Sequence, residues 1–139
     1  MTAAPAPRLL AAVAVGGALG ALARWGLMQA FPAAPDEFPW ATLAINVVGS
    51  FVLALLPAFA VVRRRQVLAV ALGPGVLGGF TTLSTYSEQA RALLDAGRTV
   101  VAAAYLLGTL AACLVAVAVA DHWSTVLERR TFEAEGGDE

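Results

Sequence analysis

The chain has 139 residues, of which 59% are hydrophobic and only 14% are charged, and its formal net charge is −1. An ordinary soluble domain is about 45–50% apolar and about 25% charged, and a small domain buries the smallest share of its surface, so the composition argues against a soluble helical bundle. The sequence has no basic stripe interleaved with aromatic residues, which argues against nucleic-acid binding.

Apolar segments predict an all-α membrane protein with four transmembrane helices, because each segment contains the roughly 20 residues that a helix needs to cross a bilayer core. The predicted helices cover residues 9–31, 38–62, 67–94 and 99–120. We expect them to form one transmembrane domain, residues 1–125, followed by a polar C-terminal tail, residues 126–139.

The first segment carries Gly16 and Gly20 on one helix face. Small residues four apart let helix backbones approach closely in lipid, so we expect this face to pack against another helix. Arg24 lies past the middle of the same segment. An intramembrane arginine is a functional candidate by default, and two roles stay open for it: bonding to loop carbonyls or contacting an ion.

Polar residues in the second and fourth segments share helix faces. Thr42, Asn46 and Ser50 are spaced four apart, as are Tyr105, Thr109 and Cys113. This spacing places each set along one side of its helix. Two interpretations remain open, interhelical hydrogen bonding and a polar line along a pore.

The third segment combines Gly78 and Gly79 with a run of hydroxyl residues up to Ser87. Adjacent glycines favour departure from a helix, and unwound backbone at membrane depth is tolerated only where it is buried in protein or lines a cavity. We therefore predict a third helix that is broken in mid-membrane. Its carbonyls are suited to a hard cation and its amides and hydroxyls to an anion; the alternative is a packing kink whose hydroxyls bond back to the helix.

Basic residues in short loops predict the orientation. The N-terminus, the second loop and the C-terminal tail hold Arg8, Arg63, Arg64, Arg65, Arg129 and Arg130, whereas the other two loops hold Arg98 and several acids. We predict that both termini are cytoplasmic, in a multi-pass protein of the inner (plasma) membrane. No carboxylate pair, Cys–His pair or metal-ligand cluster occurs in the apolar segments, so we do not expect an enzyme.

Three motifs, residues 17–25, 42–51 and 78–88, together resemble those of the small bacterial fluoride channels of the Fluc, or CrcB, family. The resemblance spans roughly residues 16–113. It implies a passive, fluoride-selective channel that exports cytoplasmic fluoride and so serves in detoxification. It also implies an antiparallel, dual-topology dimer in the lipid bilayer.

The family's functional positions carry over to this sequence as expectations. A structural Na⁺ ion at the dimer centre, which is not transported, would be held by the backbone carbonyls of Gly78 and Thr81. Arg24 and Gly79 would be structural. The implied fluoride pore is lined by Thr42, Asn46, Leu83, Ser84, Tyr86, Tyr105, Thr109 and Cys113.

The chain departs from the family at Leu83 and Tyr86, where phenylalanines are usual, and at Cys113, where a hydroxyl is usual. Leucine lacks the positive ring edge that can face an anion. The Tyr86 hydroxyl either donates to the ion or narrows the path.

Three functional alternatives follow. The first is the self-sufficient channel, as a homodimer. The second is a partly degenerate scaffold subunit of a heterodimeric channel, paired with a related subunit of opposite orientation, which the strong charge bias of the loops favours. The third is a proton-coupled exporter of small cations, which needs an acid deep in the membrane; only Glu88 qualifies, and it lies toward the end of its segment.

Overall fold

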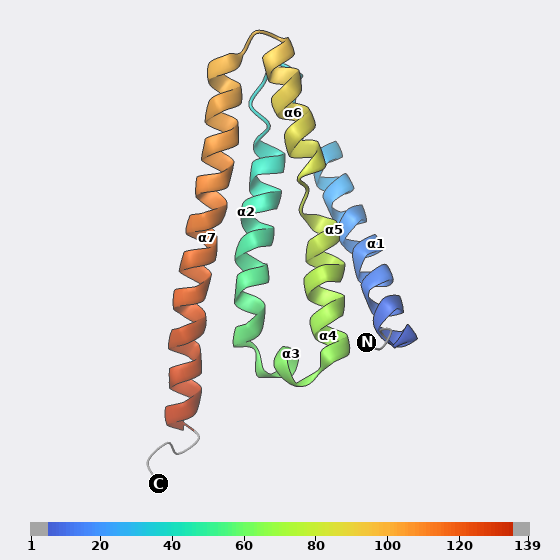
Figure 1. The fold of residues 1–139 in the computed structure, drawn as a ribbon, viewed down its shortest axis with the longest axis vertical. Coiled ribbons are helices and arrows are strands. Elements are labelled where there is room, and N and C mark those ends of the chain that lie inside the picture. The colour runs from blue at the N-terminus through green and yellow to red at the C-terminus, as the bar shows by residue number, and fades with distance from the viewer. Residues whose placement is uncertain (1–5, 135–139) are drawn as a thin grey trace, which may run out of the picture.

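The computed structural model describes the backbone of residues 6–134 and the side chains of residues 6–125. Over this range the protein is built from helices without any strand, and the helices run side by side (Figure 1). The spans long and apolar enough to cross a membrane are Pro7–Ala30, Trp40–Ala58, Gln66–Asp95 and Thr99–Thr125. The predicted all-α fold with four transmembrane helices is therefore confirmed.

The first span is α1 (Pro7–Ala30), which packs against the middle of the third span through its glycines. Its only buried residues are Gly16 and Gly20. A Cβ atom at Gly16 would overlap the carbonyl oxygen of Ala71, and one at Gly20 would overlap that of Val76. The glycine face thus allows backbone to contact backbone, which is how helices associate in lipid.

The second span is shorter as an α-helix than predicted. It consists of α2 (Trp40–Leu55), the 3₁₀ turn η1 (Leu56–Ala58) and the short α3 (Ala60–Arg64). A continuous helix to residue 62 is wrong because Pro57 lacks the N–H that would continue the ladder. Phe59 is then extended, with φ −88° and ψ 112°, and the chain turns.

The third span is interrupted, as the sequence predicts. It contains α4 (Gln66–Val70), the π-helical η2 (Ala71–Leu77), α5 (Gly78–Phe80) and α6 (Ser84–Asp95). Pro74 lies inside η2, where its missing N–H favours a wider helical register. At Thr81, φ is −74° and ψ is 160°, so the chain leaves the helix there and resumes it at Ser84.

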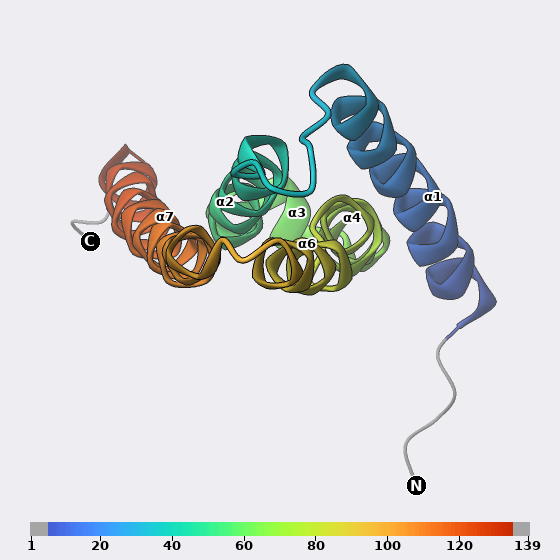
Figure 2. The same ribbon diagram turned by 90° about the horizontal axis from the view of Figure 1, so that it is seen from above.

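The fourth span is α7, which extends from Thr99 to Ala134 and passes the predicted end at residue 120. No glycine or proline interrupts the sequence between Thr109 and Ala134, so nothing local stops the helix. The last residues of the expected polar tail, 135–139, lie outside the described residues. Seen from above, α1 and α7 occupy opposite ends of the arrangement, with α2 and the third span between them (Figure 2).

Little of the surface of these helices is buried within the chain. The fully or nearly buried core cluster is Ala90, Leu93, Ala102 and Tyr105, between α6 and α7. In the most apolar 18-residue stretch of each span, only 11% to 22% of the residues are buried within the chain. Such an apolar exterior suits a chain surrounded by lipid and by other membrane helices.

Candidate functional site

The break in the third span is held open by the side chain of Asn46 from α2. Its Nδ2 atom donates to the carbonyl oxygen of Thr82 at 3.0 Å, and its Oδ1 atom accepts from the Thr82 N–H at 2.8 Å. The Asn46 side-chain amide therefore pairs with both backbone groups of the unwound Thr82, as a neighbouring β-strand would. Hydrocarbon offers no hydrogen-bond partner to exposed backbone groups. A helix break at membrane depth therefore needs these two hydrogen bonds.

Hydroxyl groups surround the same residue. Thr82 Oγ1 donates to Thr85 Oγ1 at 3.1 Å and lies 3.3 Å from Ser84 Oγ. Thr81 Oγ1 bonds back to the carbonyl of Leu77 at 2.9 Å. The hydroxyls thus form hydrogen bonds within the break and also border the space beside it. Both interpretations of this motif therefore apply, the kink whose hydroxyls bond back to the helix and the site whose hydroxyls face an anion.

Two carbonyls in the break lose their usual helical donors. In a continuous helix, the carbonyl of Gly78 would accept from the N–H of Thr82, and that of Thr81 from the N–H of Thr85. Here the Thr82 N–H donates to Asn46 Oδ1, and the Thr85 N–H donates to Thr82 Oγ1 at 3.1 Å. The oxygen chemistry of Gly78 and Thr81 therefore fits a hard monovalent cation.

Arg24 connects the break to α1. Its Nε atom donates to the carbonyl oxygen of Gly79 at 3.2 Å. A Cβ atom at Gly79 would overlap the backbone of Gly17, so the missing side chain allows α1 to lie this close. Arg24 and Gly79 thus form a structural contact that satisfies one of the carbonyls near the break.

An open pocket of about 270 Å³ lies between α2, the break and α7. Its lining combines an amide, hydroxyls and a thiol with apolar side chains. The lining residues are Asn46, Ser50, Leu53, Thr81, Thr82, Leu83, Tyr86, Thr109, Leu110 and Cys113. We call this the break pocket.

Thr109 is the unusual member of the break pocket. It is only 3% exposed, and its Oγ1 atom has no hydrogen-bond partner within the described residues. Buried polar atoms are nearly always paired, and each exception needs an explanation. The oxygen is buried in this geometry, but because Thr109 lines the break pocket, a turn of its side chain would bring the hydroxyl to a ligand that accepts a hydrogen bond. Cys113, one turn further along α7, adds a weaker donor to the same wall.

Tyr86 and Leu83 border the break pocket in different ways. The Tyr86 hydroxyl donates to the carbonyl oxygen of Leu106 at 2.7 Å, so its single proton is already in use. Of the two open roles for Tyr86, narrowing the path fits this contact and donation to an ion does not. Leu83 is 76% exposed, so this chain alone leaves one side of the pocket uncovered.

Not every predicted pore residue is brought to the break pocket. Tyr105 is fully buried, and its hydroxyl donates to Gln89 Oε1 at 3.0 Å. Thr42 is also fully buried, without a partner for its hydroxyl among the described residues. Ser84 is exposed. These three residues lie outside the pocket lining, whereas Asn46, Leu83, Tyr86, Thr109 and Cys113 line it.

Sequence reasoning missed some participants. Ser50 lines the break pocket; its spacing from Asn46 places it on the face that could form a polar line along a pore, but the pore positions implied by the family resemblance do not include it. Thr82 is the centre of the hydrogen bonds at the break, and nothing in the sequence separates it from the other hydroxyls. Gln89 is the partner of Tyr105, which depends on how α6 faces α7.

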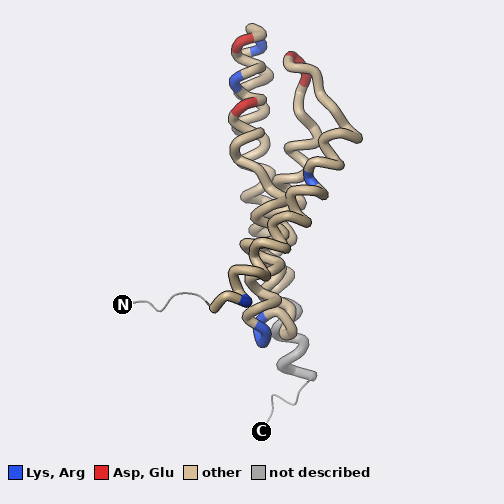
Figure 3. The backbone as a smooth tube through the Cα atoms, turned by 90° about the vertical axis from the view of Figure 1, so that its right-hand side faces the viewer, with Lys and Arg blue, Asp and Glu red and all other residues tan. Residues whose placement is uncertain are grey.

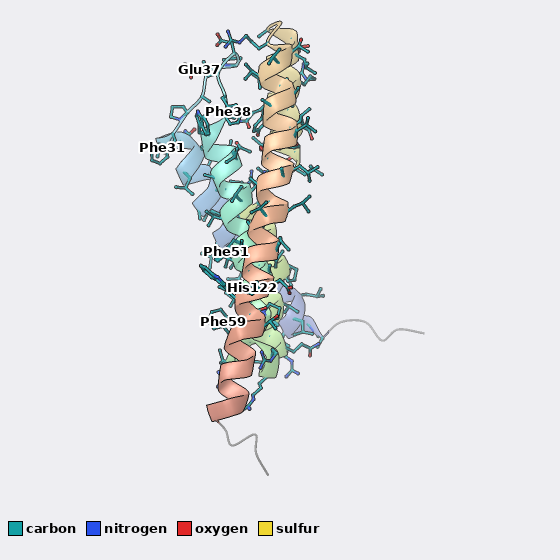
Figure 4. All side chains as sticks on the ribbon, turned by 90° about the vertical axis from the view of Figure 1, so that its left-hand side faces the viewer. Phe31, Glu37, Phe38, Phe51, Phe59 and His122 are labelled. Atoms are coloured by element: carbon teal, nitrogen blue, oxygen red, sulfur yellow. The ribbon has the colours of Figure 1, made fainter. Side chains whose placement is uncertain are left out.

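Side-chain metal ligands do not gather in the part of the chain that the structure describes. No three His, Cys, Asp or Glu side chains come together there. His122 is exposed on α7, apart from the break (Figure 4). Any cation bound at the break would therefore depend on neutral oxygens, those of the backbone and of the neighbouring hydroxyls.

Comparisons with known proteins point in one direction. A family model described as "CrcB-like protein, Camphor Resistance (CrcB)" matches residues 11–120. The "Fluoride-specific ion channel FluC 2" of Nocardia farcinica is 42% identical over 130 residues, which cover 89% of this chain and 92% of the relative. The "Fluoride-specific ion channel FluC 1" of Halobacterium salinarum is 47% identical over 120 residues, which cover 86% and 96%.

Proposed function

Because the chain belongs to the CrcB-like family, we propose that it is a fluoride-selective channel through which cytoplasmic fluoride leaves the cell passively, protecting the cell from the ion. Membership of this family of channels also confirms the expectation that the chain is not an enzyme. The observation that carries the proposal is the unpartnered hydroxyl of Thr109 in the wall of the break pocket.

The chemistry of the pocket suits a small anion that holds water tightly. Such an ion crosses only if protein donors replace its water. Asn46 has two N–H donors, one of which is used by the Thr82 carbonyl, so a second remains for the pocket. Thr109 and Ser50 add hydroxyls and Cys113 adds a thiol, beside apolar residues such as Leu53 and Leu110.

The direct test is fluoride efflux from liposomes that hold only this chain. Liposomes loaded with potassium fluoride are diluted into fluoride-free buffer, potassium is released with valinomycin, and a fluoride electrode records the flux. We expect fast fluoride efflux and no chloride efflux in matched liposomes. Equal rates for the two ions would contradict a fluoride-selective channel, whereas no flux from folded protein would contradict a self-sufficient channel and favour the heterodimeric alternative below.

We also propose that the carbonyls of Gly78 and Thr81 hold a structural Na⁺ ion. The support is that the usual helical donors to both carbonyls are engaged elsewhere. The bound ion would supply positive charge that neutralises the carbonyl dipoles at the break. A ligand that binds only the folded state raises stability by about 2.7 kcal/mol at 100 times its Kd. Thermal unfolding in sodium against N-methylglucamine chloride tests this, and equal midpoints would refute it.

We further propose that the working channel is a dimer, formed either with a second copy or with a related subunit of opposite orientation. The exposed Leu83 leaves the break pocket open on one side. Basic residues mark the end of the described chain where α1 begins, whereas the opposite end carries both acids and basic residues (Figure 3). This bias favours a single orientation with cytoplasmic termini. Labelling of introduced cysteines from each side of the native membrane tests the orientation.

A second candidate function is a partly degenerate subunit of a heterodimeric channel. The observation that favours it is Leu83, which lines the pocket without an aromatic ring edge. Leu83→Phe separates the two candidates in the liposome assay. A clear gain in fluoride efflux would show that the native leucine limits the path, whereas an unchanged rate supports the self-sufficient channel.

A further inference from the structure

The break in the third span exposes the carbonyl end of a half-helix. The helical segment formed by α4, η2 and α5 covers residues 66–80, and the chain leaves the helix at Thr81. The end of such a segment amounts to roughly half a negative elementary charge, carried by carbonyl oxygens that have lost their helical donors. A positive group at the break is therefore attracted to these oxygens.

One of these carbonyls already has a positive partner. The carbonyl oxygen of Gly79 accepts a hydrogen bond of 3.2 Å from the Nε atom of Arg24 on α1. In a continuous helix this oxygen would accept from the N–H of Leu83. Arg24 is half-buried, and Gly79 directly follows Gly78, whose carbonyl we propose as a sodium ligand. The guanidinium, which is always charged, therefore lies beside the proposed cation site.

The packing of α1 on α5 places Arg24 at this level. A Cβ atom at Gly20, one turn before Arg24, would be 2.9 Å from the backbone nitrogen of Phe80. A Cβ atom at Gly79 would overlap the backbone of Gly17. The backbones of α1 and α5 are thus in direct contact, and this contact brings the Arg24 side chain to the carbonyl end of the half-helix.

No acid pairs with Arg24 in the part of the chain that the structure describes. Its ion pair within 4 Å joins Arg91 and Asp95 instead. Glu37 and Glu88 border a pocket together with Met28, one turn beyond Arg24 on α1, so they reduce the field of Arg24 without contacting it. Asp121 is on α7, at the other end of the arrangement from α1 (Figure 2). The positive charge of Arg24 at the break is therefore not neutralised by contact.

We infer that Arg24 makes the cation site at the break selective for monovalent ions. The inference rests on the sodium site proposed above and concerns what this chain adds to it. The Coulomb energy between a fixed charge and an ion is proportional to the charge of the ion, so Arg24 repels a divalent ion twice as strongly as a sodium ion at the same place. Divalent ions depend on carboxylates, and no three acidic or other metal-binding side chains come together in the described residues.

The expected size of the effect follows from the charge of the ion. A like charge within roughly 4–6 Å weakens the binding of a proton by about tenfold or more, and a sodium ion carries the same charge. Removing the charge of Arg24 should therefore lower the Kd for sodium about tenfold. For calcium, an ion of similar size, the Kd should fall about a hundredfold, because the energy doubles with the charge.

The test measures cation binding through the thermal unfolding of the purified full-length protein without fluoride. Sodium chloride or calcium chloride replaces N-methylglucamine chloride at constant ionic strength, and the rise of the midpoint with ion concentration gives the Kd. For the wild type we expect a rise with sodium and none with calcium. For Arg24→Gln we expect tighter sodium binding and a clear rise with calcium. The two ions are compared within each variant, so a change in basal stability does not affect the result.

Two further variants separate the charge from other effects. Arg24→Lys keeps the positive charge and loses the planar guanidinium, so it should keep the wild-type preference for sodium even if its basal stability falls. Arg8→Gln removes the same charge from the exposed start of α1, roughly 24 Å along the helix from Arg24. It should bind both ions as the wild type does.

Each contradicting outcome has its own meaning. Equal stabilisation of the wild type by sodium and calcium would overturn the inference without any variant. Unchanged or weaker sodium binding by Arg24→Gln would show that Arg24 does not repel the ion, and calcium binding by Arg24→Lys would assign the selectivity to the hydrogen bond instead of the charge. No response to sodium by the wild type or by Arg24→Gln would refute the sodium site itself.

Discussion

The hydroxyl of Tyr86 donates a hydrogen bond of 2.7 Å to the carbonyl oxygen of Leu106 and so ties α6 to α7 beside the break pocket. The ring of Tyr86 also lies 5.1 Å from that of Tyr105, between ring centroids. These contacts fix the ring while they use the only proton of the hydroxyl. Tyr86 therefore shapes the pocket with its ring instead of donating to an ion.

Tyr86→Phe should accordingly change stability more than conduction. The variant keeps the ring and loses one part-buried hydrogen bond, and a hydrogen bond is worth about 0.5–1.5 kcal/mol. We expect a lower unfolding midpoint and a fluoride efflux rate close to that of the wild type. Thermal unfolding and liposome efflux on one preparation measure both. Loss of efflux in a folded variant would mean that the hydroxyl does act on the ion.

Asn46→Leu should destabilise the protein strongly. It leaves the N–H and the carbonyl of Thr82 without the partners that Asn46 now supplies, at about 1–3 kcal/mol for each buried group. Ser87→Ala is the control, because the Ser87 hydroxyl is exposed and bonds only to Leu83 of the same span. If both variants unfold at the same temperature, Asn46 does not hold the break.

Gly20→Ala and Gly26→Ala form a matched pair on α1. A Cβ atom at Gly20 would overlap the carbonyl oxygen of Val76, whereas one at Gly26 meets nothing within 4 Å. Overpacking costs about 1–3 kcal/mol, so we expect Gly20→Ala to lower the unfolding midpoint. Gly26→Ala should leave it unchanged or raise it, since alanine favours a helix. Similar midpoints for the pair would argue against the close packing of α1 on the third span.

Much of the fold was predictable because lipid limits the choices. Segment length and hydropathy alone predict the four spans, and Gly78 and Gly79 within a run of hydroxyls predict the break. The wrong boundaries have local causes. The second helix ends early because Pro57 cannot continue the ladder, and α7 passes residue 120 because no glycine or proline follows it before Ala134.

The site was less predictable, because the spacing of residues along a helix shows which of them share a face but not which part of the protein that face contacts. Tyr105 and Thr109 lie on one face of α7, yet Thr109 lines the break pocket and Tyr105 is turned to Gln89. The pairing of Asn46 with Thr82 joins residues 36 positions apart. Such contacts depend on how the spans pack, and the sequence pattern does not contain that information.

Thr109→Val tests the central claim that fluoride passes the break pocket. Valine has the shape of threonine without the hydroxyl. An unpartnered buried hydroxyl costs about 1–3 kcal/mol, so the variant should be as stable as the wild type or more stable. Thr125→Val is the control on the same helix, because the Thr125 hydroxyl is exposed and bonds to Asp121.

The decisive measurement is fluoride efflux from liposomes containing Thr109→Val, beside wild type and Thr125→Val. A hydrogen bond to a charged group is worth about 1.5–3 kcal/mol, so the account predicts that Thr109→Val slows fluoride efflux by about tenfold or more while its unfolding midpoint is maintained or raised. An efflux rate equal to that of the control would contradict the account, because fluoride would then not pass Thr109.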